Sequence, residues 1–250
     1  MSSKYYTIPP QIYDKQFWWK KDDVEFWKQI PSFKNKTILE LAAGTGRLGI
    51  PLVREGFNYT GIELSSEYCE YANLKLKKWN NSTYIANDDM RTFNLNKQFD
   101  IIFIGFNSWL HLLTEEDVVK CLQSIKKHMN PDSIFYIDNL IPNPLFLYRP
   151  KDVALRVLEF EDSRNNMIYI DEMLDYDKSL EIANITWIYS DENNNEIFNF
   201  KFQMKMYYPD TMNRLLVDNG FSIQNIWGDY DKNKINEDSV LQIYECNILI

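Results

Sequence analysis

The stretch LELAAGTGRLG, residues 39–49, decides how the rest of the chain is interpreted. It continues an apolar run and contains three glycines in the spacing G-x-G-x-x-G, at Gly44, Gly46 and Gly49. Glycines at a turn between a strand and a helix allow positive φ angles and a close approach of the backbone to a ligand. The pattern therefore predicts a strand, a ligand-binding turn and a helix. It excludes a P-loop, because Ile50 follows Gly49 and no Gly-Lys-Ser/Thr sequence is present.

Apolar runs alternate with helical patterns from about residue 37 to residue 140, which is typical of βαβ units around a parallel sheet. The runs expected to form parallel strands are TILEL (37–41), YTGIEL (59–64), STYIAN (82–87), FDIIFIGF (99–106) and SIFYID (133–138). A helix is expected to begin at Thr114, with Asp117 three residues on as in a capping box, and to close near Asn130-Pro131. His128 falls in its last turn, where a cation suits the helix dipole, so we expect a structural role for it.

The pattern changes after about Pro150. Residues 153–207 contain strand-like runs separated by polar turns at 162–166, 175–179 and 191–195, as in an antiparallel meander. Apolar and polar residues alternate from Phe198 to Met206, which predicts a strand with one buried face. Tyr208-Pro209 then introduces a helix over 210–221 with Gly220 as its stop, and two final strands near 222–228 and 239–249 close the main sheet.

These patterns predict an α/β fold with a Rossmann-like, seven-stranded mixed sheet, mostly parallel with an antiparallel terminal hairpin, and an inserted antiparallel sheet that acts as a cap. We expect a helical segment over 1–33, a core over 34–150 and 208–250, and the cap over 151–207. The first segment is rich in aromatic residues. It either packs on the core or forms a lid.

Composition limits the partners. The chain of 250 residues is 45% hydrophobic and carries a formal net charge of −9, which disfavours a nucleic-acid backbone or an anionic membrane as the main partner. No apolar run approaches the roughly 20 residues that span a bilayer, and the start lacks the apolar stretch of a signal peptide, so we expect a cytoplasmic protein. Three separated cysteines, Cys69, Cys121 and Cys246, fit neither a disulfide framework nor a metal site, and we expect them in the core.

The position of the glycines relative to the end of the first strand distinguishes two classes of cofactor-binding protein. A dinucleotide-binding turn places its first glycine directly after the strand, here position 42, and that residue is alanine. Glu40-x-Ala42-x-Gly44-x-Gly46 instead resembles the first motif of class I S-adenosylmethionine-dependent methyltransferases. The resemblance implies that the Glu40 carboxylate lies near the ammonium group of the cofactor, a cation that a nicotinamide dinucleotide lacks. It also implies that the loop backbone passes beside the methionine part.

Two acidic positions extend this resemblance. Glu63, at the end of the second strand, is suited to accept both ribose hydroxyls, although NAD enzymes use the same device. NDDMRTF (87–93) resembles the motif after the third strand of methyltransferases, in which an acidic residue takes the adenine amino group and the next side chain lies on the ring. Asp89 and Met90 match it, with Asp88 as a substitute for Asp89.

The segment FIGFNSWLHLLTEED (103–117) resembles the same region of small-molecule methyltransferases, including amino-sugar N-methyltransferases. His111 is either the general base or a brace for the helix that begins at Thr114. Asn107 and Ser108 are candidates for hydrogen bonds to cofactor or substrate. Asp138 either orients His111 or meets the substrate.

The resemblance implies further contacts. Tyr13 resembles an N-terminal tyrosine that closes over the cofactor, and Trp18 and Trp19 would wall the pocket. Arg47 either meets the carboxylate of the methionine moiety or is an ordinary exposed arginine. The expected cofactor-binding residues are Tyr13, Glu40, Ala42, Gly44, Gly46, Arg47, Glu63, Leu64, Asp88, Asp89, Met90, Phe106 and Asn107. The expected catalytic residues are His111 and Asp138, and the expected substrate-binding residues are Trp18, Trp19, Ser108 and His111.

No metal is expected. Asp138-Asn139 resembles the metal-binding pair of catechol-type O-methyltransferases, but those enzymes also need an acidic ligand after the fourth strand, where this chain has Gly105-Phe106-Asn107.

The sequence thus indicates a methyltransferase that uses S-adenosylmethionine, releases S-adenosylhomocysteine, and acts on an oxygen or nitrogen of a small polar metabolite such as a sugar, amino sugar or nucleotide-linked derivative. The alternatives are an NAD-binding oxidoreductase and a non-catalytic cofactor-binding protein. The chain is expected to be a monomer or a homodimer. Four basic residues near the cap either hold a phosphate or carboxylate of the substrate or are solvated surface charges: Arg149, Lys151, Arg156 and Arg164.

Overall fold

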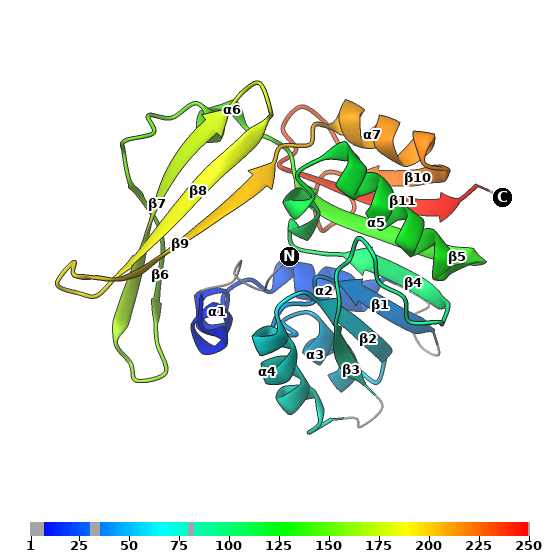
Figure 1. Cartoon of the computed structure of the whole chain (residues 1–250), viewed down its shortest axis with the longest axis horizontal. Helices are drawn as coiled ribbons and strands as arrows, with labels where there is room; N and C mark the ends of the chain where they lie inside the picture. The colour runs from blue at the N-terminus through cyan, green and yellow to red at the C-terminus, as the bar shows by residue number, and fades with distance from the viewer. Residues whose placement is uncertain (1–7, 31–35, 80–82, 250) are drawn as a thin grey trace.

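The computed structural model describes residues 8–30, 36–79 and 83–249 and contains two β-sheets with helices around them (Figure 1). The helices are α1 Pro10–Gln16, α2 Asp22–Gln29, α3 Gly49–Arg54, α4 Ser66–Leu76, α5 Glu115–Lys127, α6 Pro144–Leu147 and α7 Pro209–Asp218, with a 3-10 helix η1 at Ser108–His111. The strands of the main sheet are β1 Thr37–Leu41, β2 Asn58–Glu63, β3 Tyr84–Asn87, β4 Phe99–Ile104, β5 Met129–Leu140, β10 Phe221–Trp227 and β11 Leu241–Ile248. The strands of the second sheet are β6 Leu155–Glu161, β7 Met167–Asp177, β8 Ile182–Ser190 and β9 Glu196–Lys205.

The main sheet has seven strands in the order β10-β11-β5-β4-β1-β2-β3. Strands β1 to β5 pair in parallel, whereas β11 pairs antiparallel with β5 and with β10. The order reverses at β1, so the carboxyl ends of β1, β2 and β4 meet at the topological switch point where ligands of α/β sheets bind. The predicted fold class is confirmed.

Helices cover both faces of this sheet. On one face, α5 and α7 pack through residues such as Leu122 and Leu216 onto the larger apolar cluster. On the other face, α2, α3 and α4 pack through Trp27, Leu52 and Ala72 onto a second cluster. Since the central strands β1, β2, β4 and β5 contribute to both clusters, they read as nearly continuous apolar runs, as expected for a sheet buried on both sides.

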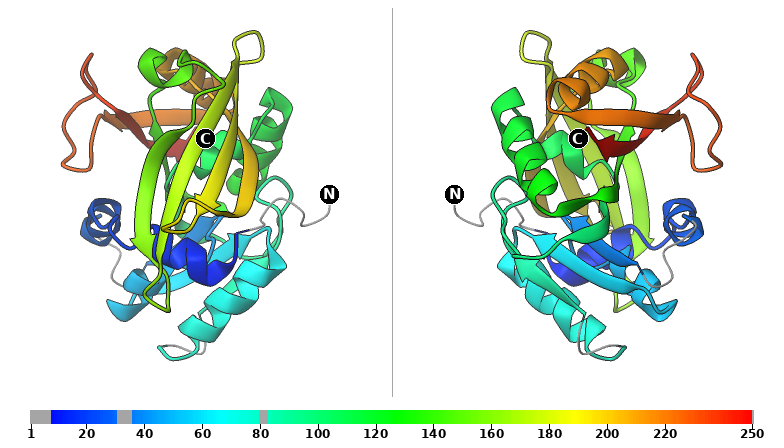
Figure 2. Two further views of the ribbon diagram at one scale, coloured as in Figure 1. Left: turned by 90° about the vertical axis from the view of Figure 1, so that its left-hand side faces the viewer. Right: turned by 90° about the vertical axis from the view of Figure 1, so that its right-hand side faces the viewer.

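The second sheet is an antiparallel meander, β6-β7-β8-β9, and we call it the cap sheet. Its inner face carries the apolar side chains of β9, while Asn199 and Lys201 on the other face are exposed, as the alternation predicted. Helix α1 lies between the cap sheet and the main sheet and contacts both β6 and α4 (Figures 1 and 2). The first segment therefore joins the two sheets.

Helix α5 ends earlier than the sequence predicted. Thr114 caps its first turn by accepting a hydrogen bond from the Asp117 amide, as expected, but the helix stops at Lys127, and Asn130-Pro131 already belong to β5. The buried ring of His128 explains the difference, because its Nδ1 bonds the Ser124 carbonyl and its Nε2 accepts from the Leu95 amide. The structural role predicted for His128 is confirmed.

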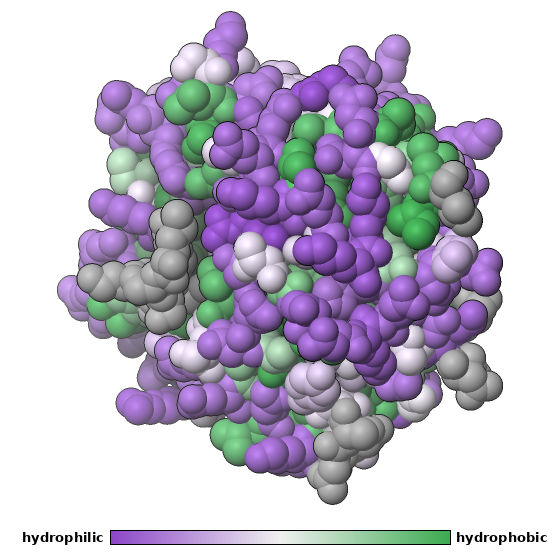
Figure 3. All heavy atoms as spheres, turned by 45° about the vertical axis from the view of Figure 1, so that its right-hand side comes forward, coloured by the Kyte–Doolittle hydropathy of each residue, from purple (hydrophilic) through white to green (hydrophobic). Residues whose placement is uncertain are grey.

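The cysteines and the surface complete the description of the fold. Cys69, Cys121 and Cys246 are free and buried. In the part of the chain that the structure describes, no helix is long and apolar enough to cross a membrane. Hydrophilic side chains predominate on the face shown in Figure 3, in keeping with the net charge of −9.

Candidate active site

The glycine loop between β1 and α3 has an irregular backbone. Three of its residues lie in the left-handed region: Ala42 at φ 57°, Gly44 at φ 57° and Gly46 at φ 81°. A non-glycine residue in this region costs about 1 kcal/mol or more and is found mainly where function requires it. Gly49 has another role, because a Cβ there would collide with the ring of Tyr59.

Glu63 supports this loop from the end of β2. Its Oε2 accepts a hydrogen bond from the Gly44 amide at 2.9 Å, and its Oε1 accepts one from the Ser65 amide at 2.8 Å. The side chain is buried, and burial raises the pKa of Glu63 although both amides oppose the shift. Leu64 follows Glu63 directly, and its carbonyl accepts from Asn87.

Glu40 lies beneath the loop on β1. It is 3% exposed, and its Oε2 accepts a hydrogen bond from the hydroxyl of Tyr59 at 2.5 Å. Burial raises the pKa of Glu40 to about 8, although the Tyr59 hydrogen bond and the charge of Arg47 lower it. Near neutral pH this carboxyl group is therefore protonated, unless a cation binds beside it.

A cavity of about 20 Å³ lies above Glu40. It is bounded by the glycine loop, helix α1 and the end of β4, and it brings together seven of the residues predicted from the sequence: Tyr13, Glu40, Ala42, Gly44, Arg47, Phe106 and Ser108. A larger cavity of about 440 Å³ lies between α2 and the β10–β11 connection, and its lining contains none of the predicted residues. We therefore place the candidate site at the smaller cavity, where the predicted residues converge.

Arg47 is not free to meet a ligand carboxylate as one interpretation had it. Its two terminal nitrogens donate to the buried carboxylate of Asp23 on α2, and Nη1 also donates to the carbonyl of Lys20. The guanidinium group lies over the ring of Phe106, 4.2 Å from the ring centre. Arg47 thus ties α2 to the glycine loop and to the end of β4.

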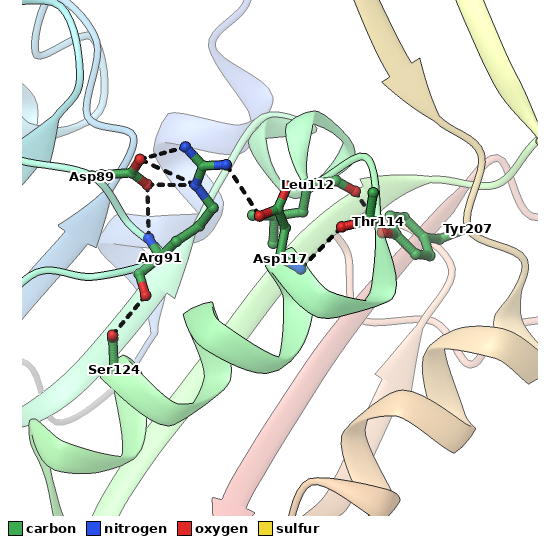
Figure 4. A network of polar contacts seen from close by, with 7 residues as sticks. All are labelled: Asp89, Arg91, Leu112, Thr114, Asp117, Ser124 and Tyr207. Atoms are coloured by element: carbon green, nitrogen blue, oxygen red, sulfur yellow. Dashed lines mark hydrogen bonds and ion pairs between the residues drawn. The ribbon is translucent and has the colours of Figure 1, made fainter. Parts of the chain in front are cut away.

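The loop after β3 holds the adenine candidates. Asp89 is paired with Arg91 through both carboxylate oxygens, and Arg91 reaches on to Asp117 of α5 (Figure 4). Burial opposes ionisation of Asp89, but the Arg91 hydrogen bonds outweigh it and lower the pKa of that carboxyl. Met90 packs against the larger apolar cluster. The carboxylate of Asp88 accepts only from the adjacent Asp89 amide among the contacts of the described residues, which leaves it more available than Asp89.

The connection from β4 to η1 is strained and held from below. Phe106 (φ 54°) and Asn107 (φ 64°) are both left-handed. Asp138 accepts from the Phe106 amide and from the Tyr230 hydroxyl at 2.8 Å through Oδ2, while its carbonyl accepts from the Asn107 amide. The Asn107 side chain in turn accepts from the Leu140 amide. These bonds fix the conformation that places Phe106 and Ser108 at the cavity.

Asp138 therefore positions backbone and does not orient His111. Burial raises the pKa of Asp138 to about 6, against the hydrogen bonds from Tyr230 and Phe106. His111 instead contacts the cap sheet, where its Nδ1 lies 3.2 Å from the carbonyl oxygen of Gln203. The expectation that Asp138 orients His111 is wrong because the two side chains are held by different partners.

The 3-10 helix that carries His111 packs against β5 of the main sheet and β9 of the cap sheet. Loss of hydration in this position lowers the pKa of His111 below its ordinary 6.5, although the hydrogen bond to Gln203 raises it. A hydrogen bond to a carbonyl requires the proton on Nδ1, which leaves the lone pair of Nε2 free. A neutral imidazole with a free Nε2 is the form that a general base needs.

The two tryptophans that were predicted to wall the pocket are placed elsewhere. Trp18 and Trp19 are 61% and 49% exposed and do not line the cavity. Phe17 points inward instead, with its ring 5.0 Å from Tyr13 and 4.9 Å from Phe106. The prediction chose Trp18 and Trp19 because a run of aromatic residues does not show which of them turns toward the core, here in the turn that follows α1.

Asp14 links helix α1 to the glycine loop and to α4, which the sequence did not indicate. Its Oδ1 accepts from the buried hydroxyl of Thr45 in the glycine loop, and its Oδ2 accepts from Lys75 of α4, both at 2.5 Å. Near the end of α1, the carboxamide of Gln16 accepts from Tyr189 of the cap sheet. Helix α1 is thereby fastened across the cavity. The sequence around Asp14 could not reveal these partners, because Thr45 and Lys75 lie 31 and 61 residues further along the chain.

Two of the three arginines near the cap are also paired within the protein. Arg149 bonds Glu172, and Arg156 bonds Asp171. Within the described ranges, no group of three His, Cys, Asp or Glu side chains could hold a metal ion.

Residues 38–132 match the family model described as "Methyltransferase domain". YqeM of Bacillus subtilis (strain 168), which is named a methyltransferase only provisionally, is 28% identical over 136 residues, covering 51% of this chain and 55% of that protein. The chain spans about half the length of the curated relatives it matches.

Similarity over the whole chain is structural. An S-adenosylmethionine-dependent methyltransferase from Clostridium acetobutylicum ATCC 824 superimposes with a TM-score of 0.77 at 17% identity, over 96% of this chain and 97% of that chain. The sugar N-methyltransferase KedS8 from Streptoalloteichus sp ATCC 53650 gives a TM-score of 0.64 at 15% identity, over 93% and 87%. At these identities the likeness shows the fold. Residues 38–132 therefore match the methyltransferase-domain model, and the chain as a whole has the fold seen in S-adenosylmethionine-dependent methyltransferases.

Proposed function

We propose that this protein transfers a methyl group from S-adenosylmethionine to an oxygen or nitrogen of a small polar metabolite. The observation that carries the proposal is Glu40, a buried carboxyl group with a pKa near 8 that lines the cavity under the glycine loop. A carboxyl group in this position is suited to a cationic ligand. The α-ammonium group of the cofactor supplies such a cation, whereas a nicotinamide dinucleotide does not.

The other residues fit the rest of the cofactor. Glu63 at the end of β2 is placed for the ribose hydroxyls, since its lone pairs exceed the two amide bonds that it accepts. Asp88 is the more available partner for the adenine amino group, with Met90 beside it. Tyr13 and Phe106 form the walls next to the methionine part. Because a cavity of 20 Å³ holds about one water molecule, we infer that the Tyr13 side of the site opens when the cofactor binds.

The reaction then depends mainly on placement. The cofactor supplies a methyl group on a positively charged sulfur, which is already a good leaving group. The protein must hold the acceptor in line with that methyl group, and such alignment supplies much of the rate. Nε2 of His111 takes the proton that the hydroxyl or amine must lose.

Polar groups near His111 support a polar acceptor. The Nδ1 atom of His111 lies beside the Gln203 carbonyl of the cap sheet, and the same sheet carries the ion pair of Arg149 and Glu172. The fold shared with a protein titled a sugar N-methyltransferase agrees with this acceptor class and does not identify the acceptor.

Calorimetric titration tests the proposal. S-adenosylmethionine and S-adenosylhomocysteine should bind the full chain saturably, and NADH should not. Glu63→Gln should weaken both sulfur cofactors, whereas Glu245→Gln on the distant strand β11 should bind them like the wild type. Transfer of a labelled methyl group to a panel of sugars and amines then distinguishes an enzyme from a non-catalytic binding protein. Binding of NADH alone would replace the proposal by the oxidoreductase reading.

A further inference from the structure

Three side chains form a polar cluster on the inner face of the cap sheet. Nη2 of Arg149, which follows α6, donates to Oε1 of Glu172 on β7 at 2.5 Å. The indole nitrogen of Trp187 on β8 donates to the other oxygen, Oε2, at 2.7 Å. The side chains of Arg149 and Glu172 are 10% and 7% exposed. We call these three residues the cap triad.

The cap triad lies where two apolar clusters meet. On the inner face of β7, Ile168 and Ile170 belong to the cluster under the cap, and Leu174 belongs to the larger cluster of the main core. Glu172 stands between them, directly opposite Trp187 on β8. Apolar residues at these alternate positions would continue the packing, so the ion pair interrupts an otherwise apolar face.

Such an ion pair is poorly explained by stability. Removing two charges from water costs more than their attraction usually returns, and apolar replacements are often neutral or stabilising. Moreover, Nε of Arg149 is buried and has no hydrogen-bond partner among the described residues. An unpaired buried donor calls for an explanation, and an acceptor atom supplied from outside the protein would provide one.

Aromatic contacts connect the cap triad to the candidate active site. The ring of Trp187 lies 6.4 Å from Phe17, and Phe17 lies 4.9 Å from Phe106 at the cofactor cavity. In the other direction, Trp187 lies 5.0 Å from Phe202, whose ring is 6.3 Å from His111. The cap triad therefore shares one aromatic wall with the cavity and with the proposed base.

We propose that Arg149, Glu172 and Trp187 form the subsite that recognises the methyl acceptor, and that they select a neutral hydroxylated ring such as a sugar. This inference rests on the proposed function.

The chemistry of the cap triad specifies a hydroxyl. A hydroxyl group both donates and accepts, so it can donate to Glu172 and accept from Nε of Arg149. A phosphate would meet the carboxylate of Glu172, and an ammonium would meet the guanidinium of Arg149, so each like-charge contact opposes binding. The flat faces of Trp187 and Phe202 offer apolar area to the carbon-bound hydrogens of a sugar ring, as in most small-molecule sites, where a few polar groups orient the ligand.

Binding can be measured before the natural acceptor is known. Saturation-transfer NMR on the full chain with S-adenosylhomocysteine compares glucose, glucosamine at a pH where it is an ammonium, and glucose 6-phosphate. Glucose should give the strongest binding of the three. The double variant Arg149→Met/Glu172→Leu replaces the ion pair by apolar groups, so it should fold with an unchanged or raised melting temperature and bind glucose at least 10-fold more weakly.

A second ion pair on the cap sheet provides a matched control. Arg156 and Asp171 form an ion pair between β6 and β7 on the opposite face of the cap sheet. Arg156→Gln/Asp171→Asn should leave glucose binding unchanged. Equal binding of glucose by the wild type and the Arg149/Glu172 double variant would overturn the proposal, and so would a preference for either charged sugar or no binding of any. Failure of S-adenosylhomocysteine to bind counts against the proposed function instead, because the sugars are also measured without it.

Discussion

The hydroxyl of Tyr59 donates a hydrogen bond of 2.5 Å to Glu40, and the two side chains lie on neighbouring parallel strands, β2 and β1, beneath the glycine loop. The ionisation state of Glu40 depends on the balance between its burial and this hydrogen bond. Burial raises the pKa of Glu40 to about 8, so at pH 7 the free protein holds this carboxyl group mostly protonated. A cationic ligand must shift it towards the carboxylate.

Binding of S-adenosylmethionine should therefore release a proton. Below pH 8 the free Glu40 is protonated and the bound form ionised, so the affinity should rise with pH by up to about tenfold per unit and level off above pH 8. Calorimetry in buffers of different ionisation enthalpy measures the number of protons released, which should approach about one near pH 6.5.

Two variants check the origin of that proton. Glu40→Gln should bind weakly and release none. Tyr59→Phe removes the hydrogen bond that lowers the pKa of Glu40, so the pH at which affinity levels off should move upward. An affinity that is independent of pH in the wild type would show that Glu40 is already ionised.

A side chain at Gly49 should destabilise the protein, because the glycine leaves room for the ring of Tyr59. A Cβ at this position meets the Tyr59 ring, which would displace the hydroxyl from Glu40. Gly49→Ala should lower the free energy of unfolding by about 1–3 kcal/mol, as overpacking does, and should weaken cofactor binding as well. Urea unfolding and calorimetry measure the two effects.

Gly44→Ala is the comparison. Its Cβ would meet no atom within 4 Å, but the φ angle of 57° remains unfavourable for alanine. We expect a cost of about 1 kcal/mol from that strain. If Gly49→Ala costs no more than Gly44→Ala, the close approach of Tyr59 does not limit this position.

The sequence predicted the arrangement of the main sheet well because its signals are local. Apolar runs of strand length, the glycines at 44–49 and the hydroxyl of Thr114 before a helix each act within a few residues. The five parallel strands and the terminal hairpin follow from them. Ends of elements were less certain, since the stop of α5 depends on His128 binding the amide of Leu95, a partner 33 residues away.

For the candidate site, the sequence indicated which residues would lie close together but not which groups they would bind. Glu40, Gly44 and Phe106 converge on one cavity as their places at strand ends required. The sequence could not show that Arg47 is bound by Asp23 or that Asp89 is bound by Arg91, because both ion pairs form only after the chain has folded. Charged residues near a motif have several possible partners, and packing decides among them.

His111 should act in turnover and not in cofactor binding. With an acceptor found by labelled-methyl transfer, His111→Asn should lower kcat by about 10²- to 10⁴-fold, the usual contribution of a general base, and leave the affinity for S-adenosylhomocysteine unchanged. The pKa of His111 lies below 6.5, so wild-type kcat should be level between pH 7 and 8 and fall in acid as the imidazole takes up a proton.

The other histidine is a natural control. His128 is buried and bonds Ser124 and Leu95, so His128→Asn should lower the melting temperature without removing the acid limb of the pH profile. Unchanged kcat in His111→Asn would return His111 to a purely structural role at the end of η1.

Asp14 is expected to control the rate at which the cofactor site opens. The closed cavity of about 20 Å³ cannot admit the cofactor while α1 is fastened to Thr45 and Lys75. Asp14→Asn keeps a hydrogen-bonding side chain but removes the charge opposite Lys75, a partly exposed ion pair worth about 1 kcal/mol. The open form should become roughly fivefold more populated, so stopped-flow fluorescence should show association of S-adenosylhomocysteine accelerated by that factor.

Lys15→Gln, on an exposed position of the same helix, should leave both rates unchanged, and Lys75→Met should reproduce the effect of Asp14→Asn from the other side of the ion pair. If opening of α1 is the step that limits access, dissociation should accelerate as well, because the bound cofactor leaves by the same route. Association rates equal to that of the wild type in both Asp14→Asn and Lys75→Met would mean that the cofactor enters past another wall of the cavity, such as the strained connection at Phe106 and Asn107.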